Sequence, residues 1–287
     1  MEEFPPEIFS EITNHLSYVD TISLSWVSKA CNEKTKKKDI NLLIDNFISR
    51  PQYLGDDAGL FLKKLRESGE YISGSFLLKI LYDADWECDL DVYKFVVEQT
   101  TDPISIEWGI LIDSLLNTNP DIIQRKCGNR YEILGVVNRN FLRNDFKIDH
   151  TIVYNNPYSD NSLSYKKRNY SDIFDFIDTM FDIDICKAVY DGKKLYIKSK
   201  HNLVYRCSLA HSKLLDYDRI PGYPDNAPSI PELLAKMLYR VRKYKNRGFC
   251  VKKTYHTVQI LTDYVRDSGI AVRFYEEPVF THNNDIL

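Results

Sequence analysis

One stretch, residues 70–97, constrains what this chain can fold into more than any other. It predicts a strand, a turn at Gly74 and Ser75, a helix rich in apolar residues, and a second strand that carries Asp89 and Asp91. Glycine allows a sharp turn and the close approach of another group. The N–H groups that open the helix favour a bound anion, and the Ser75 hydroxyl can cap the helix or bind a phosphate oxygen.

The two aspartates of the second strand predict a cation site. Side chains alternate along a strand, so Asp89 and Asp91 share one face while Leu90 and Val92 point into the core. Two carboxylates on one face raise each other's pKa unless a cation joins them. Mg²⁺ or Mn²⁺ suits such oxygen ligands together with the phosphates of a substrate. The alternative is an exposed strand edge beside a plain helix cap.

A third carboxylate is expected from another strand, and the later sequence MFDIDIC (residues 180–186) supplies the candidates. Its apolar residues alternate with Asp182 and Asp184, which predicts a strand with one acidic face. An acidic face on an otherwise apolar strand is difficult to explain as core. Asp184 is the favoured metal ligand, and Asp182 is its substitute.

A helix in the C-terminal third carries a second charged pattern. Ser229 and Glu232 form a capping box before an apolar run. Basic residues then follow at i, i+4, i+7 and i+11, a stripe separate from the apolar face: Lys236, Arg240, Lys243 and Arg247. This basic stripe predicts a rim that binds a triphosphate or a nucleic-acid backbone, and a solvated helix face is the alternative.

These features together resemble the nucleotidyltransferase superfamily that includes DNA polymerase beta. A Gly-Ser pair, a short helix, an Asp-x-Asp strand and a later carboxylate strand follow in that order, and Asp89 follows Gly74 at the interval usual for the motif. The segments ISGSFLLKIL, DLDVY, FDIDICKAVYDGKKLYI and RKYKNRGF also resemble nucleotidyltransferase-like proteins of large DNA viruses and some fungi. The resemblance covers roughly residues 58–250.

This resemblance implies a metal-dependent transfer of a nucleotidyl group from an NTP to an acceptor such as RNA or a protein. It implies that Asp89, Asp91 and Asp184 bind Mg²⁺ or Mn²⁺ and act in catalysis. Gly74, Ser75 and the basic stripe would then bind the nucleotide.

The first forty residues show a different pattern. Apolar residues at 8, 12 and 16 have helical spacing after two prolines, and a second short helix is expected from Asp20. The sequence FPPEI and the apolar positions that follow resemble the F-box, although Phe4 replaces the commoner leucine and Ala30 replaces an aromatic residue. The resemblance implies binding of a Skp1-type adaptor of a ubiquitin ligase. The alternative is a helical cap packed on the rest of the chain.

The sequence thus predicts an α+β fold with a nucleotidyltransferase-like mixed sheet flanked by helices. The expected units are an F-box-like helical unit at 1–40, a nucleotidyltransferase-like core at 41–200, and a mostly helical region with the basic helix at 201–287. Strands are expected at 131–137, 147–154 and 194–198. A second functional hypothesis is a catalytically inactive binding module that acts as an F-box-type substrate receptor for a ubiquitin ligase.

Composition limits the remaining classes of function. A net charge of −3 means that any nucleic-acid site must be local. The six cysteines form no Cys-x-x-Cys pair, which predicts reduced thiols, and Cys186, His201, Cys207 and His211 match no standard zinc spacing. The acidic, proline-bearing start predicts no signal peptide, and no apolar run has the length of a membrane span. A cytoplasmic or nuclear protein without a membrane partner is expected.

Overall fold

The computed structural model describes residues 5–35, 38–97, 122–125, 136–143, 146–155, 170–210 and 230–253. Its helices are α1 (Pro6–His15), α2 (Tyr18–Val27), α3 (Lys29–Lys34), α4 (Ile40–Ile48), α5 (Ala58–Ser68), α6 (Ser75–Tyr82), α8 (Ile173–Met180), α9 (Lys200–Val204) and α10 (Ile230–Asn246), with short 3₁₀ helices η1 (Gly55–Asp57) and η4 (Asp184–Cys186). Its strands are β1 (Glu70–Ser73), β2 (Leu90–Val97), β3 (Ile122–Arg125), β4 (Val136–Arg143), β5 (Phe146–Asn155), β6 (Val189–Tyr190), β7 (Leu195–Tyr196), β8 (Cys207–Ala210) and β9 (Cys250–Lys253).

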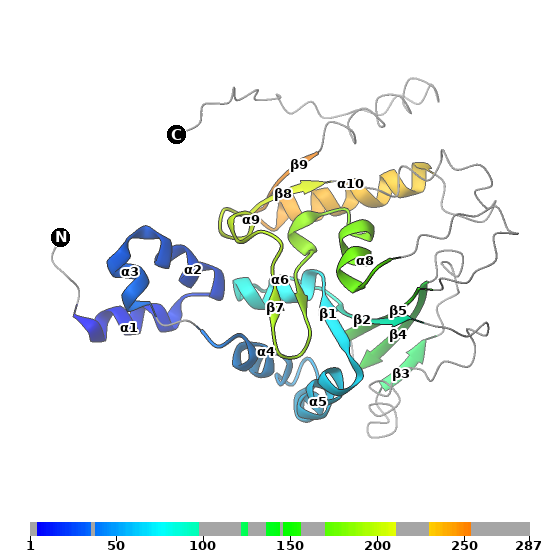
Figure 1. Cartoon of the computed structure of the whole chain (residues 1–287), viewed down its shortest axis with the longest axis horizontal. Helices are drawn as coiled ribbons and strands as arrows, with labels where there is room; N and C mark the ends of the chain where they lie inside the picture. The colour runs from blue at the N-terminus through cyan, green and yellow to red at the C-terminus, as the bar shows by residue number, and fades with distance from the viewer. Residues whose placement is uncertain are drawn as a thin grey trace, which may run out of the picture.

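The main sheet is mixed, with the strand order β3-β4-β5-β2-β1-β6-β7 (Figure 1). β2 and β5 are parallel neighbours, whereas β1 pairs in antiparallel fashion with β2 on one side and β6 on the other. Helices flank this sheet, which confirms the predicted α+β class. β8 and β9 form a separate parallel pair, and β9 directly follows α10.

The two faces of the sheet are covered by different helices. On one face, Ile72, Val92 and Ile148 pack in a cluster with residues of α4, α5 and α6. On the other face, Tyr93 and Val153 pack with residues of α8. Because side chains alternate along a strand, Asp91 shares the α8 face with Tyr93.

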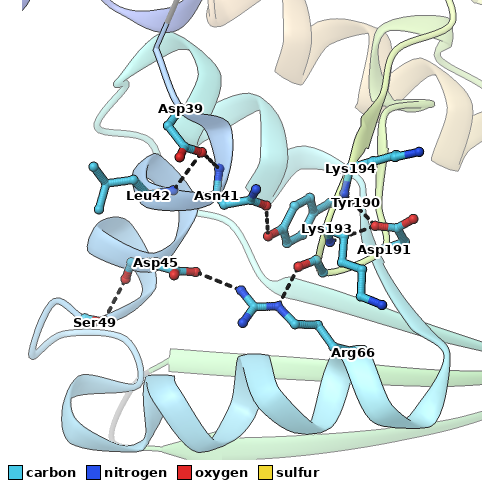
Figure 2. A network of polar contacts seen from close by, with 11 residues as sticks. Asp39, Asn41, Leu42, Asp45, Ser49, Arg66, Tyr190, Asp191, Lys193 and Lys194 are labelled. Carbon is cyan, nitrogen blue, oxygen red and sulfur yellow. Dashed lines mark hydrogen bonds and ion pairs between the residues drawn. The ribbon is translucent and has the colours of Figure 1, made fainter.

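A polar network ties α4 and α5 to the hairpin between β6 and β7 (Figure 2). Arg66 donates from Nε to the Gly192 carbonyl at 2.6 Å, and its Nη2 lies 3.6 Å from Asp45 Oδ1. Tyr190 donates to Asn41 Oδ1 at 2.7 Å. Gly192 has φ +85°, and a Cβ there would lie 2.6 Å from Arg66 Cγ, so glycine is needed for the turn and for the contact.

The N-terminal helices α1–α3 project from one end of the body, and α2 makes the contact with it (Figure 1). Val19 of α2 is buried with Leu78, Leu81 and Tyr82 of α6. Ile8 and Ile12 of α1 remain 49% and 42% exposed, one helical turn apart. The helices expected after Pro6 and near Asp20 are therefore present, and an apolar face of α1 lies open.

Several expected elements are confirmed, including the strand at 70–73, the helix that opens at Ser75, and the strand at 147–154. The strand expected at 131–137 is described only from Val136, where β4 begins, and the return strand at 194–198 is shorter, at Leu195–Tyr196. The capping Ser229, His211 and the sequence beyond Lys253 lie outside the described residues. The described cysteines are free thiols, of which Cys186 is buried and Cys250 is exposed. In the described part of the chain, no helix combines the length and the apolar character that crossing a membrane requires.

Candidate functional site

Gly74 joins β1 to α6 in a conformation that only glycine adopts readily. Its φ is +82° and its ψ is −154°, and it is the N-cap of α6. A Cβ at this position would lie 2.5 Å from Asp91 Oδ2. Glycine is therefore required both by the backbone and by the carboxylate that approaches it, and the turn and the acid form one local structure.

Strand pairing brings Asp91 next to a second aspartate. In the antiparallel pair of β1 and β2, Ser73 lies opposite Asp91, which explains the approach to Gly74. In the parallel pair of β2 and β5, Asp91 is in register with Asp149. Partners in register on neighbouring strands present their side chains on the same face. Asp149 is thus the carboxylate that the fold supplies from another strand, on the face that Asp91 occupies.

Lys147 links this pair to the third aspartate. Its Nζ lies 2.7 Å from Asp149 Oδ2 and 3.2 Å from Asp89 Oδ2, and Asp89 lies immediately before β2. Burial acts to lower the pKa of Lys147, but Asp149 and Asp89 together raise that pKa above its usual value. The ammonium is therefore held in its charged form between two carboxylates.

The side chains of the protein do not fully neutralise the carboxylates or satisfy their hydrogen bonds. Burial, followed by the negative charges of Asp149 and Asp89, raises the pKa of Asp91 to about 7. Burial also raises the pKa of Asp149, against the opposing effect of the Lys147 hydrogen bond. Asp149 Oδ1 is buried and has no hydrogen-bond partner among the described residues. A divalent cation would relieve both conditions, since it favours the ionised form and supplies a partner for the buried oxygen.

Asp89, Asp91 and Asp149 do not form a complete metal-binding group in this conformation. Within the described residues, no group of three or more His, Cys, Asp or Glu side chains converges tightly enough to hold a metal ion. The Lys147 ammonium pairs with both the Asp89 and the Asp149 carboxylates. The donors Asp89, Asp91 and Asp149 fit a hard cation by their chemistry, and a cation that uses all three must displace Lys147.

The predicted acidic strand at 180–186 is wrong. Asp184–Cys186 forms η4, and Ile183 makes only an isolated bridge to Ala210. Asp182 Oδ2 accepts a hydrogen bond from Arg240 Nη1 at 2.8 Å, and Asp184 Oδ1 lies 2.7 Å from Lys187 Nζ. Each acid is thus paired with a cation, although Lys187 is shared with Asp178. The third carboxylate beside Asp91 is Asp149, and neither Asp184 nor its substitute Asp182 takes that place.

Sequence reasoning missed Asp149 and Lys147, although it predicted the strand that carries them. The available signal was a charged pair at i and i+2, on a strand whose other neighbours, Phe146 and Ile148, are apolar and prove to be buried. The two acids at 182 and 184 gave a stronger local pattern. Only the pairing of β2 with β5 shows which pattern faces Asp91.

Helix α10 lies along the body (Figure 1), and the four residues of its basic stripe have different environments. Arg240 is paired with Asp182, and Arg247 donates to the Glu87 carbonyl and lies over the Trp86 ring at 4.8 Å. Lys243 interacts electrostatically with Asp89, while burial and the nearby Arg247 charge lower its pKa. Lys236 is exposed. The stripe thus divides into two anchors, one cation near the carboxylates and one exposed residue.

Tyr244 of α10 connects this helix to the glycine turn. Its pKa is raised well above the usual value by burial, and its side chain hydrogen-bonds Cys186 and Ser75. No side chain caps the start of α6, so the expected capping role of Ser75 is not observed. The Gly74–Ser75 turn is thus in contact with Asp91 on one side and with Tyr244 of α10 on the other.

Comparisons with known proteins give one structural neighbour. No protein-family model matches the sequence, and no curated protein matches it. The fold is similar to that of the Thermotoga maritima CCA-adding enzyme complexed with tRNA, with 14% sequence identity and a TM-score of 0.43. The match covers 80% of this chain and 46% of that one, so this chain spans about half the length of the enzyme.

Proposed function

We propose that this protein is a metal-dependent nucleotidyltransferase that transfers a nucleotidyl group from an NTP to an acceptor hydroxyl. One observation carries the proposal: Asp91 lies directly against the glycine turn that opens α6, and it is in register with Asp149 on the neighbouring parallel strand. Carboxylates beside an uncapped helix N-terminus suit the joint binding of a divalent cation and a polyphosphate. The order of these elements also agrees with the superfamily that the sequence resembles.

Each residue has a role that follows from its position. Asp89, Asp91 and Asp149 would hold Mg²⁺ or Mn²⁺, which when bound supplies charge neutralisation for the phosphates and the leaving pyrophosphate. The N–H groups that follow Gly74 would orient the triphosphate, and Ser75 lies at the same turn. Lys243, already near Asp89, would bind the far phosphates. Arg240 and Arg247 would position α10 through Asp182 and the Glu87 carbonyl.

The proposal is tested by nucleotide incorporation. Purified protein is incubated with each of the four labelled NTPs and Mn²⁺, with the protein itself, tRNA or bulk protein as acceptor. We expect incorporation that Asp91→Asn abolishes. NTP binding without incorporation under any of these conditions would contradict the enzymatic role and favour a catalytically inactive binding module.

A second role rests on the N-terminal helices. Ile8 and Ile12 of α1, and Trp26 and Val27 at the end of α2, are exposed by 42–72% although all are apolar. Exposed apolar groups of this kind favour binding of a partner, and the F-box resemblance points to a Skp1-type adaptor. A pull-down with Skp1 that is positive for the intact protein and lost in the double variant Ile8→Asp, Ile12→Asp would support this role. No capture of Skp1 by the intact protein would contradict it.

A further inference from the structure

The three aspartates of the site are poorly neutralised by the protein itself. Among the described residues, Lys147 is the cation that hydrogen-bonds them, and it reaches Asp89 and Asp149. Asp91 lies beside Asp149 in the strand register but is not one of the carboxylates that this ammonium bonds. The protein alone therefore places one bonded ammonium among three acids.

The backbone of Lys147 is held in place, whereas its side chain is free to move away from the carboxylates. Its backbone is fixed in β5 between Phe146 and Ile148, which are 8% and 2% exposed. Its side chain is 35% exposed, and a lysine ammonium is a mobile point charge on a flexible stem. The backbone can thus stay in place while the ammonium moves from the carboxylates to solvent or to a nearby phosphate.

We infer that Lys147 is an internal counter-cation that a divalent cation displaces when it binds with the nucleotide. This inference rests on the proposed function, since it concerns the same site. In the nucleotide-free protein, the ammonium satisfies Asp89 and Asp149 and weakens the binding of a second cation between them. When a triphosphate is present, its negative charge offers the displaced ammonium a new partner. Metal binding and nucleotide binding are therefore coupled through Lys147.

The test measures Mn²⁺ affinity by the electron paramagnetic resonance signal of free Mn²⁺, with and without a non-hydrolysable ATP analogue. In the absence of nucleotide, we expect Lys147→Gln to bind Mn²⁺ about tenfold or more tightly than wild type, because the competing charge is gone. Lys147→Arg keeps the charge and should bind as weakly as wild type. Lys193→Gln, an exposed residue of the β6–β7 hairpin, removes the same charge elsewhere and should also match wild type.

The coupling gives a second readout. The ATP analogue should raise the Mn²⁺ affinity of wild type strongly and that of Lys147→Gln only slightly, and Mn²⁺ should change the affinity for the analogue by the same factors. Thermal unfolding in EDTA verifies that each variant is folded. In Lys147→Gln we also expect a larger rise of Tm on addition of Mn²⁺ than in wild type.

The outcomes separate the two proposals. Equal Mn²⁺ affinity of wild type and Lys147→Gln, with binding lost in Asp91→Asn, would overturn the role of Lys147 and leave the proposed function intact. No Mn²⁺ binding by any folded variant, even with the analogue, would overturn both. Tight binding by Lys147→Gln without any incorporation of nucleotide would support Lys147 as counter-cation and contradict only the proposed reaction.

Discussion

Two Asp-x-Asp sequences, at 89–91 and at 182–184, lie between apolar residues in the same chain and have opposite electrostatic environments after folding. Asp182 pairs with Arg240, and Asp184 pairs with Lys187, which also binds Asp178, itself paired with Lys198, so that three acids meet three cations. Asp89 and Asp91 are joined by a third acid, Asp149, and the three acids have one bonded ammonium, that of Lys147, which reaches Asp89 and Asp149. The first set is balanced and serves to hold η4 and α10, whereas the second is short of positive charge and adjoins the glycine turn. A deficit of cations distinguishes the candidate site from a structural ion pair.

The largest expected difference between the two regions is catalytic. Asp149→Asn should lower nucleotide incorporation by about a hundredfold or more, because a metal ligand contributes several kcal/mol to stabilising the transition state. Asp184→Asn should retain most of the incorporation, since Asp184 is bound to Lys187 and not to Asp91. The measurement is the initial rate with saturating NTP and Mn²⁺. The reverse pattern of losses would assign the site to 182–184.

The next largest expected effect is a loss of stability on substituting Gly74, which lies against Asp91. The 182–184 region has no glycine in such a position. Gly74→Ala should destabilise the protein by about 1–3 kcal/mol from backbone strain, beyond the clash of the new Cβ with the carboxylate. Gly59→Ala in α5 is the matched control, because nothing lies within 4 Å of its added Cβ. This control should stabilise the helix by about 0.5–1 kcal/mol. Urea unfolding measures both changes, and similar values for the two variants would show that the Gly74 turn is not strained.

Neutralising one acid in each region should shift stability in opposite directions. The pKa of Asp91 rises from 3.8 to about 7 on folding, so the folded protein keeps a proton that the unfolded chain loses. The free energy of unfolding of the metal-free protein therefore falls as pH rises from about 4 to about 7. Asp91→Asn removes this loss, and its Tm at pH 8 in EDTA should exceed that of wild type by several degrees. The difference should vanish towards pH 4.

Asp182→Asn is the counterpart in the balanced region. It leaves Arg240 without its carboxylate, and it should lower the Tm at pH 8 by a few degrees, consistent with about 1 kcal/mol for a buried carboxylate paired with a half-exposed arginine. Thermal unfolding at pH 4 and pH 8 measures both variants together. If the two substitutions change the Tm in the same direction at pH 8, the contrast between the regions is wrong.

The smallest expected effect is a difference in NTP affinity between variants of two residues of the basic stripe. Lys243→Gln should weaken binding of an NTP analogue by about three- to tenfold and reduce its dependence on salt, because Lys243 lies near the carboxylates. Lys236→Gln removes the same charge at an exposed position nearer the N-terminus of α10 and should change the affinity by less than twofold. Isothermal calorimetry at two salt concentrations measures this. Equal effects of the two variants would indicate a general electrostatic attraction without a specific role for Lys243.

The local sequence pattern was sufficient to predict the part of the site within residues 70–97. The glycine between β1 and α6, the apolar residues of α6 and the alternation of β2 are encoded within residues 70–97. Each element formed close to where it was expected, with Asp89 just before β2 instead of within it. The strand that carries Asp149 was also predicted. The 180–186 stretch failed because alternation alone does not separate a strand from an irregular segment whose acids bind nearby cations, Lys187 and Arg240.

The sequence by itself determined the glycine turn, the helix behind it and the pair Asp89–Asp91, because each depends on residues close together in the chain. Only the tertiary structure decided which acid completes the set and which basic residues are already engaged. Asp149 reaches Asp91 through a parallel strand pair, and such pairs join distant segments by a long crossover. The packing of the whole sheet determines which strands pair, and local periodicity does not predict this pairing.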